Sequence, residues 1–195
     1  MSTEIDVIAR PPSTALLDQW APLRAVPGVP GVAAHQASDV HGLWQAWEAD
    51  CGCECDTPFW ATVWPAGRVL AAMILDGTVR VDGRHVLDLG CGGAVVGIAA
   101  ANAGAASVVA NDTDSVSLAV ARRNAQANGV AIDLCQDDLC CTAADIAADT
   151  IFVADCFYER GVSVRMLDML QAQRARGATV VVADGGRPFA PGEGF

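Results

Sequence analysis

Basic side chains are scarce in this 195-residue sequence. Lysine and arginine together number 12, aspartate and glutamate number 23, and the formal net charge is −11. Binding to a nucleic acid backbone depends on clustered lysine and arginine side chains that release counterions. The shortage therefore argues against nucleic acid as a partner, and a basic or lysine-bearing partner suits the charge better.

Long hydrophobic runs are also missing, although 52% of the residues are hydrophobic. No segment reaches the roughly 18 apolar residues that a membrane span requires. Residues 1–10 hold three charged side chains and no apolar core of the kind that a signal peptide has. We therefore expect a soluble, cytoplasmic protein that makes no membrane contact and folds around a single core.

The sequence shows no catalytic arrangement of its three histidines and no cysteine pair with the usual zinc spacing. Cys51, Cys53 and Cys55 are separated by single residues, whereas paired zinc ligands typically have two to four residues between them. This spacing predicts that the three cysteines bind no metal. In a reducing compartment the eight cysteines serve as free thiols and small hydrophobic side chains.

The segment 10–37 contains five prolines and several glycines, which interrupt regular structure. One short helix is expected over residues 14–20, and the rest is interpreted as an arm or cap outside the core. A second helix is expected over residues 38–49, with Ser38 as its N-cap. Residues 1–56 are therefore assigned to an N-terminal arm with helices.

From residue 84 onward, short apolar runs alternate with helical patterns. The expected strands cover residues 85–89, 107–111, 132–135, 151–154 and 179–183. The expected helices cover residues 66–76, 94–103, 115–128 and 159–175. Strands that alternate with helices predict βαβ units and an α/β fold, in which a mostly parallel sheet is buried on both faces.

A glycine turn follows the first of these strands. In Asp88-Leu89-Gly90-Cys91-Gly92 the glycines let the backbone approach a ligand, and the following helix start exposes free amides. The next strand ends at Asp112, twenty positions after Gly92, where a carboxylate can accept both ribose hydroxyls. Asp114 is expected to cap the helix after it. Together they predict a nucleotide-type site.

Four segments in order narrow the family: residues 58–67, 110–114, 155–158 and 184–188. With the glycine turn they resemble the electron-transfer flavoprotein beta-subunit lysine methyltransferases, which are class I, seven-strand methyltransferases with an Asp-x-x-Tyr motif. The resemblance covers about residues 57–189. It implies a Rossmann-like three-layer sandwich with strand order 3-2-1-4-5, and it makes residues 57–195 an S-adenosylmethionine-binding methyltransferase domain. The C-terminal hairpin usual in such domains is apparently missing.

The resemblance also implies how S-adenosylmethionine is held. Asp88 faces an ammonium group that S-adenosylmethionine carries and NAD lacks, and Asp112 binds the ribose. Asp137 is assigned to the adenine amine, with Asp138 as an equally reachable acid. The remaining cofactor-binding residues are Gly90 and Gly92 in the turn, and Trp60 and Trp64, which either lie beside the cofactor or fill the core.

Asp155 and Tyr158 are the expected catalytic residues. Asp155 ends the fourth strand, where it orients the incoming amine or alternatively caps the following helix. Tyr158 offers an aromatic face and a hydroxyl group. The expected activity is N-methylation, most plausibly of an accessible lysine on a protein substrate. The alternatives are a small-molecule, nicotinamide-like N-methyltransferase and a cofactor-binding module that has lost catalysis.

Two further expectations concern surfaces. A protein substrate predicts an open acidic rim around Asp155, whereas a small molecule predicts an enclosed apolar pocket. The last strand would form an exposed sheet edge, which invites a homo-oligomer.

Overall fold

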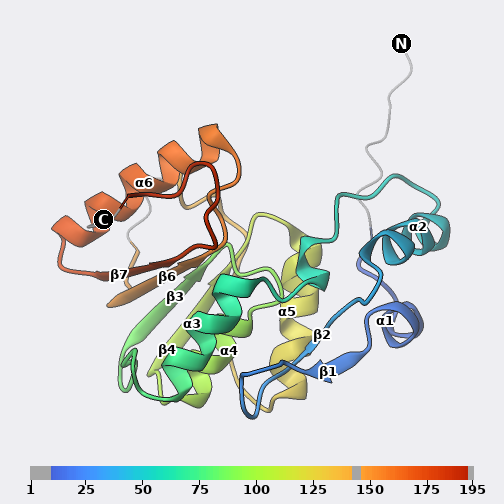
Figure 1. Cartoon of the computed structure of the whole chain (residues 1–195), viewed down its shortest axis with the longest axis horizontal. Helices are drawn as coiled ribbons and strands as arrows, with labels where there is room; N and C mark the ends of the chain where they lie inside the picture. Colours follow the sequence, from blue (N-terminus) through green and yellow to red (C-terminus); the bar gives the residue numbers. More distant parts are fainter. Residues whose placement is uncertain (1–9, 142–145, 193–195) are drawn as a thin grey trace.

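The computed structural model describes residues 10–141 and 146–192, and its centre is a five-stranded parallel sheet (Figure 1). The strands are β3 (His85–Leu89), β4 (Ser107–Asn111), β5 (Asp133–Cys135), β6 (Thr150–Ala154) and β7 (Thr179–Ala183). Their order is β5-β4-β3-β6-β7. In sequence order this is 3-2-1-4-5, so the predicted topology is confirmed. Within the described residues the sheet ends at β7, and residues 193–195 at the predicted truncated end lie outside them.

Helices cover both faces of the sheet. The helices α3 (Pro65–Leu75), α4 (Val95–Asn102) and α5 (Ser115–Ala127) lie on one face, and α6 (Arg160–Ala175) lies on the other. Strand alternation explains the two cores, because Val86 packs with α3 and α4 while Leu87 packs with α6. The three-layer prediction is therefore confirmed.

Local chemistry defines several helix ends. Proline at the first position of α3 loses no helical hydrogen bond there. Asp114 caps α5 by accepting hydrogen bonds from the amides of Val116 and Ser117 at 2.8 and 3.0 Å, as predicted. For α2 (Val40–Cys51) the predicted cap was wrong: Asp39, not Ser38, accepts from the Gly42 amide at 2.9 Å.

The N-terminal region is more structured than the sequence predicted. After α1 (Thr14–Trp20), the strands β1 (Leu23–Ala25) and β2 (Ala33–His35) form an antiparallel hairpin. Val26, Val29 and Val32 in its turn are buried in the same cluster as α3 and α4. The expectation that this segment lies outside the core was wrong, because its glycines and prolines shape a hairpin turn.

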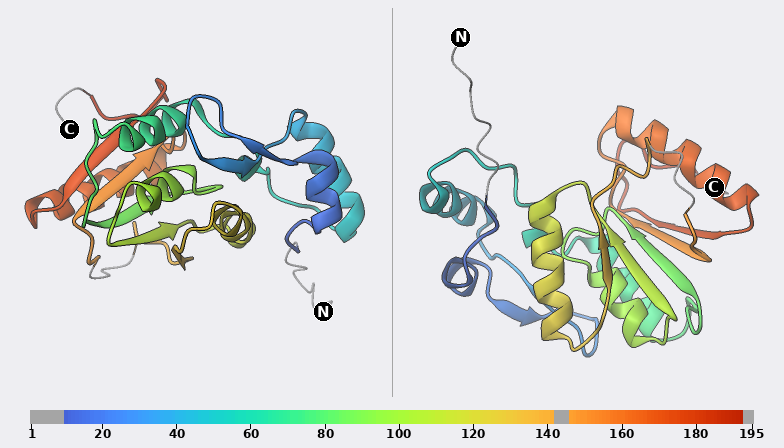
Figure 2. Two further views of the ribbon diagram at one scale, coloured as in Figure 1. Left: turned by 90° about the horizontal axis from the view of Figure 1, so that it is seen from below. Right: turned by 180° about the vertical axis from the view of Figure 1, so that it is seen from behind.

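Two asparagines of α5 fasten β2 to the main fold. Asn128 exchanges hydrogen bonds with the backbone of Ala33, at 2.9 Å to its amide and 2.7 Å to its carbonyl. Asn124 accepts from the His35 amide and donates to the Gly93 carbonyl, both at 2.9 Å. Figure 2 shows the N-terminal elements gathered beside α5, away from α6 and β7. None of the described helices has the length and apolar character needed to cross a membrane.

Candidate active site

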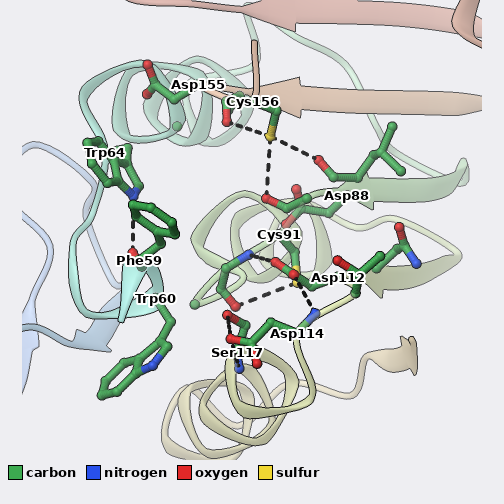
Figure 3. A pocket seen from close by; sticks show the side chains of 18 of the residues that line it. Phe59, Trp60, Trp64, Asp88, Cys91, Asp112, Asp114, Ser117, Asp155 and Cys156 are labelled. Carbon is green, nitrogen blue, oxygen red and sulfur yellow. Dashed lines mark hydrogen bonds between the residues drawn. The ribbon is translucent and has the colours of Figure 1, made fainter. Parts of the chain in front are cut away.

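A cavity of about 580 Å³ opens at the carboxyl ends of β3, β4 and β6. Its walls also include residues 56–64, which contain the short helix η1 (Phe59–Ala61). Parallel strands bring the residues that follow them to one edge of the sheet, which is where open α/β sheets bind ligands. The volume is that of a small-molecule site, and Figure 3 shows the side chains that surround it.

The glycine turn forms the cavity floor. Gly90 has φ +68°, and a Cβ atom there would lie 2.6 Å from the Sγ of Cys156. Gly92 has φ +51°, and its amide donates to Oδ2 of Asp112 at 2.9 Å. Both positions therefore require glycine for the turn to keep this shape. Asp112 in turn ties the floor to the end of β4.

Asp88 is a buried carboxylate at the end of β3. Its Oδ2 accepts a hydrogen bond from the Gly97 amide of α4 at 2.8 Å, and the residue lines the cavity. Burial raises the pKa of Asp88 to about 7; the Gly97 amide opposes the shift, and the charge of Asp112 adds to it. A cationic group in the cavity would favour the ionised form.

Asp112 accepts two backbone hydrogen bonds. Oδ2 binds the Gly92 amide, and Oδ1 binds the Asp114 amide at 3.0 Å. Burial raises its pKa, and the hydrogen bonds from backbone amides work against that shift. A carboxylate has about four acceptor positions, so the two oxygens retain capacity for two ligand hydroxyls.

The third predicted acid was assigned to the less suitable of two neighbours. Asp137 is exposed and does not line the cavity, whereas Asp138 does. Asp138 uses Oδ1 to accept from the Cys140 amide at 3.0 Å. Asn111, which sequence reasoning missed, donates to the carbonyls of Cys135 and Asp137, both at 2.9 Å, and holds this loop against β4. The missed signal was a polar residue at the end of an apolar strand.

The two tryptophans of the 58–67 segment have different surroundings. The Trp60 side chain is 2% exposed, and its ring meets that of Trp47 edge-on at 6.4 Å, as the core interpretation expected. Its backbone still borders the floor, because a Cβ atom on Gly93 would lie 3.3 Å from the Trp60 carbonyl. The Trp64 ring lies at the outer wall, where its Nε1 donates to the Phe59 carbonyl at 3.1 Å.

Asp155 is buried and held in a left-handed backbone conformation with φ 56°. Its Oδ2 accepts from the Ala66 amide at 2.8 Å, so it caps α3. The alternative that it caps the following helix was wrong, since α6 begins after Glu159 without a side-chain cap. A non-glycine residue at this φ is strained, and such strain concentrates at functional sites.

Arg187 completes the surroundings of Asp155. The arginine Nε lies 3.7 Å from Oδ1 of Asp155, and its guanidinium stands 4.7 Å from the centre of the Trp64 ring. The Gly185 amide also donates to Oδ1, at 3.3 Å. The residues 184–188 entered the family resemblance, but the sequence carried no signal that this arginine would reach Asp155.

The rim of the cavity is aromatic. The Phe59 ring lies 6.2 Å from that of Trp64 and 5.8 Å from that of Tyr158, and burial raises the pKa of the Tyr158 hydroxyl. Phe59 and Tyr158 are 48% and 55% exposed. The expected acidic rim around Asp155 was wrong, because Asp155 is covered and paired with Arg187. The predicted openness is present.

Cys156 closes the cavity between β3 and β6. Its Sγ donates to the carbonyl of Ala154 at 3.2 Å and to that of Gly90 at 3.7 Å. Burial raises its pKa to about 12, reinforced by the charges of Asp88 and Asp112. The thiol therefore stays protonated and serves in packing and hydrogen bonding.

Comparisons with known proteins agree with this geometry. Residues 69–180 match the family described as ribosomal protein L11 methyltransferase (PrmA). The chain is 35% identical over 131 residues to the electron transfer flavoprotein beta subunit lysine methyltransferase of Danio rerio, an alignment that covers 67% of this chain and 51% of that protein. The chain thus spans about half the length of the curated relatives it matches.

Two solved structures are also similar. The ribosomal protein L11 methylase of Lactobacillus delbrueckii subsp. bulgaricus is 26% identical, with 60% of this chain and 58% of that chain covered and a TM-score of 0.46. The magnesium protoporphyrin IX methyltransferase of Synechocystis PCC 6803 with bound SAM is 20% identical, with 63% and 62% covered and a TM-score of 0.48. Because the family match spans more than half of its residues, the chain belongs to the ribosomal protein L11 methyltransferase (PrmA) family, and the predicted methyltransferase resemblance is confirmed.

Proposed function

We propose that this chain binds S-adenosylmethionine and transfers its methyl group to a lysine nitrogen of a protein. The observation that carries the proposal is the pair of buried carboxylates, Asp88 and Asp112, on either side of the glycine turn in a cavity of about 580 Å³. S-adenosylmethionine supplies a methyl group activated on a sulfonium sulfur. Its ammonium and ribose hydroxyls match the acids that the two strands present.

The chain's own residues account for each part of that ligand. Asp88 pairs with the ammonium group, and Gly90 and Gly92 let the backbone approach the methionine part. Asp112 accepts the ribose hydroxyls beside its two amide partners. Asp138 takes the adenine amine in place of Asp137, because only the former lines the cavity.

The acceptor side of the site holds groups suited to an amine. Methyl transfer is an in-line displacement, so the enzyme must orient a nitrogen with a free lone pair. A lysine ammonium approaching Asp155 meets the ring faces of Trp64 and Tyr158, which attract cations. Arg187 occupies the same two partners, Trp64 and Asp155. The acceptor therefore competes with a resident cation.

Protein lysine is favoured over a small molecule for two reasons. The rim is open and aromatic instead of enclosed, and relatives that are 35% identical are named electron transfer flavoprotein beta subunit lysine methyltransferases. The net charge of −11 would steer a lysine-rich surface toward the chain. We also infer a reducing compartment such as the cytoplasm from the eight free cysteines, and pairing of a second copy along the β7 edge.

The test supplies labelled S-adenosylmethionine with three acceptor sources: a cell extract, purified electron transfer flavoprotein beta subunit, and ribosomal protein L11. Label on a protein lysine is expected, and the printed chain contains no lysine that could accept it by self-methylation. Initial rates should fall with added salt and rise with pH until the amine is neutral. Label on a small molecule, or rates indifferent to salt and pH, would move the assignment to the small-molecule alternative.

A further inference from the structure

Three cysteine side chains converge at the C-terminal end of α2, away from the glycine turn. The Sγ atoms of Cys51 and Cys55 lie 3.2 Å apart, and those of Cys53 and Cys51 lie 3.1 Å apart. All three sulfurs lie within 4.8 Å of one another. We call these three residues the cysteine cluster.

The backbone explains why the three thiols meet. Cys51 is the last residue of α2, and Gly52 caps the helix in a left-handed conformation with φ 70°. This cap reverses the chain, so Cys53 and Cys55 return to the helix end. The sequence rule against a metal counts residues along the chain, whereas the helix cap sets the distances in space.

The sulfur separations suit a small thiophilic ion. Zinc–sulfur bonds of about 2.3 Å in a tetrahedron place two sulfurs roughly 3.8 Å apart. The two short separations are within about 0.7 Å of that value. Cys51 and Cys53 are only partly buried, so small side-chain rotations can open the cluster around an ion.

A fourth ligand is at hand. Glu48 lies one turn before the end of α2, and its Oε1 accepts a hydrogen bond from the Cys55 amide at 3.1 Å. The carboxylate therefore sits beside the cysteine cluster. Zinc binds thiolate sulfur and carboxylate oxygen, and structural zinc sites have four protein ligands.

We propose that the cysteine cluster binds one zinc ion, with the Glu48 carboxylate as the fourth ligand. Each thiol loses its proton to solvent as its sulfur binds the ion. Cys55 is followed by Asp56 and Thr57, which line the cavity. The ion would therefore fasten this cavity wall to α2. The proposal stands independently of the proposed methyl transfer.

Cobalt and zinc titrations of the full chain test the proposal. The protein is purified in a thiol-free reductant, stripped with a chelator and titrated with Co(II), which reports thiolate ligands through charge-transfer absorption. We expect one ion per chain, with the intensity of three cobalt–sulfur bonds, and displacement of cobalt by zinc. Zinc should also raise the melting temperature, because it binds the folded state.

Two matched serine variants separate the cysteine cluster from other thiols. Cys53→Ser should weaken zinc binding at least 100-fold and reduce the charge-transfer band. Cys141→Ser removes an exposed cysteine outside the cluster and should leave both unchanged. A wild-type spectrum without charge transfer would overturn the proposal by itself, whatever the variants do. A full band in Cys53→Ser, or a disulfide within the cluster in reducing buffer, would also overturn it.

Discussion

The floor and the rim of the cavity are built in different ways. The floor consists of the glycine turn and the strand-end acids Asp88 and Asp112, which are held by backbone amides. The rim combines Phe59, Tyr158 and Arg187, which come from three separate segments and make contact through side chains. The floor is rigid and suited to one cofactor, whereas the rim is half-exposed and suited to an acceptor that comes and goes.

Removing a floor carboxylate gives the largest expected effect on that comparison. Asp112→Ala should weaken binding of S-adenosylmethionine and its demethylated product by about 2–4 kcal/mol, since hydrogen bonds to a charged group are lost. It also leaves the Gly92 and Asp114 amides without their acceptor. Calorimetry measures the loss, and Asp137→Ala, at an exposed position outside the cavity, is the control. Equal effects of the two variants would contradict the floor assignment.

Asp155→Asn tests whether the acceptor side can fail while the floor stays intact. Turnover should fall about 100-fold, because the amine is no longer oriented by a charged carboxylate. Cofactor affinity should change less than about twofold. The amide oxygen can still accept from the Ala66 amide, so the loss of stability should stay within about 1–2 kcal/mol.

The control for that variant is Glu159→Gln, at a neighbouring exposed acid that provides no side-chain cap. Kinetics, calorimetry and thermal denaturation on both proteins separate the roles. If Asp155→Asn loses cofactor binding or unfolds, Asp155 is a structural cap and has no catalytic role.

The raised pKa of Asp88 gives the floor a pH dependence. The folded-state pKa is about 7, above the value of about 3.9 for a free aspartate. The folded chain therefore holds a proton that the unfolded chain releases, and this group makes the free energy of unfolding fall as pH rises from about 4 to about 7.

Cofactor binding should show the opposite slope. The ligand ammonium pairs with ionised Asp88, so affinity should rise up to about tenfold per pH unit on approaching pH 7. Asp88→Asn should bind more weakly and lose that slope. Calorimetry with the demethylated product below and above neutral pH measures both. The same slope in the variant would assign it to another group.

The smallest expected effect is at the rim. Arg187→Gln frees the Trp64 face and the Asp155 carboxylate, so the KM for a protein lysine should fall about threefold to tenfold, as expected for one exposed cation–π contact and ion pair. Cofactor affinity should be unchanged. Arg160→Gln, at an exposed arginine that begins α6, is the control. A higher KM in Arg187→Gln would mean that the arginine positions the acceptor.

The sequence by itself determined the sheet, its strand order and the floor of the cavity. Apolar strands alternate with helices, and parallel strands must carry Asp88 and Asp112 to the same edge. These features depend on local periodicity and on glycine conformations, so they can be read along the chain.

Only the tertiary structure decided the rest. The hairpin in the core, the exclusion of Asp137 from the cavity, the burial of Asp155 against Arg187 and the meeting of the cysteine cluster all depend on packing between separate segments. Side-chain contacts across such distances leave no periodic pattern. Asp137 and Asp138 are adjacent and chemically identical, so only the path of the loop places one in the cavity wall and the other in solvent.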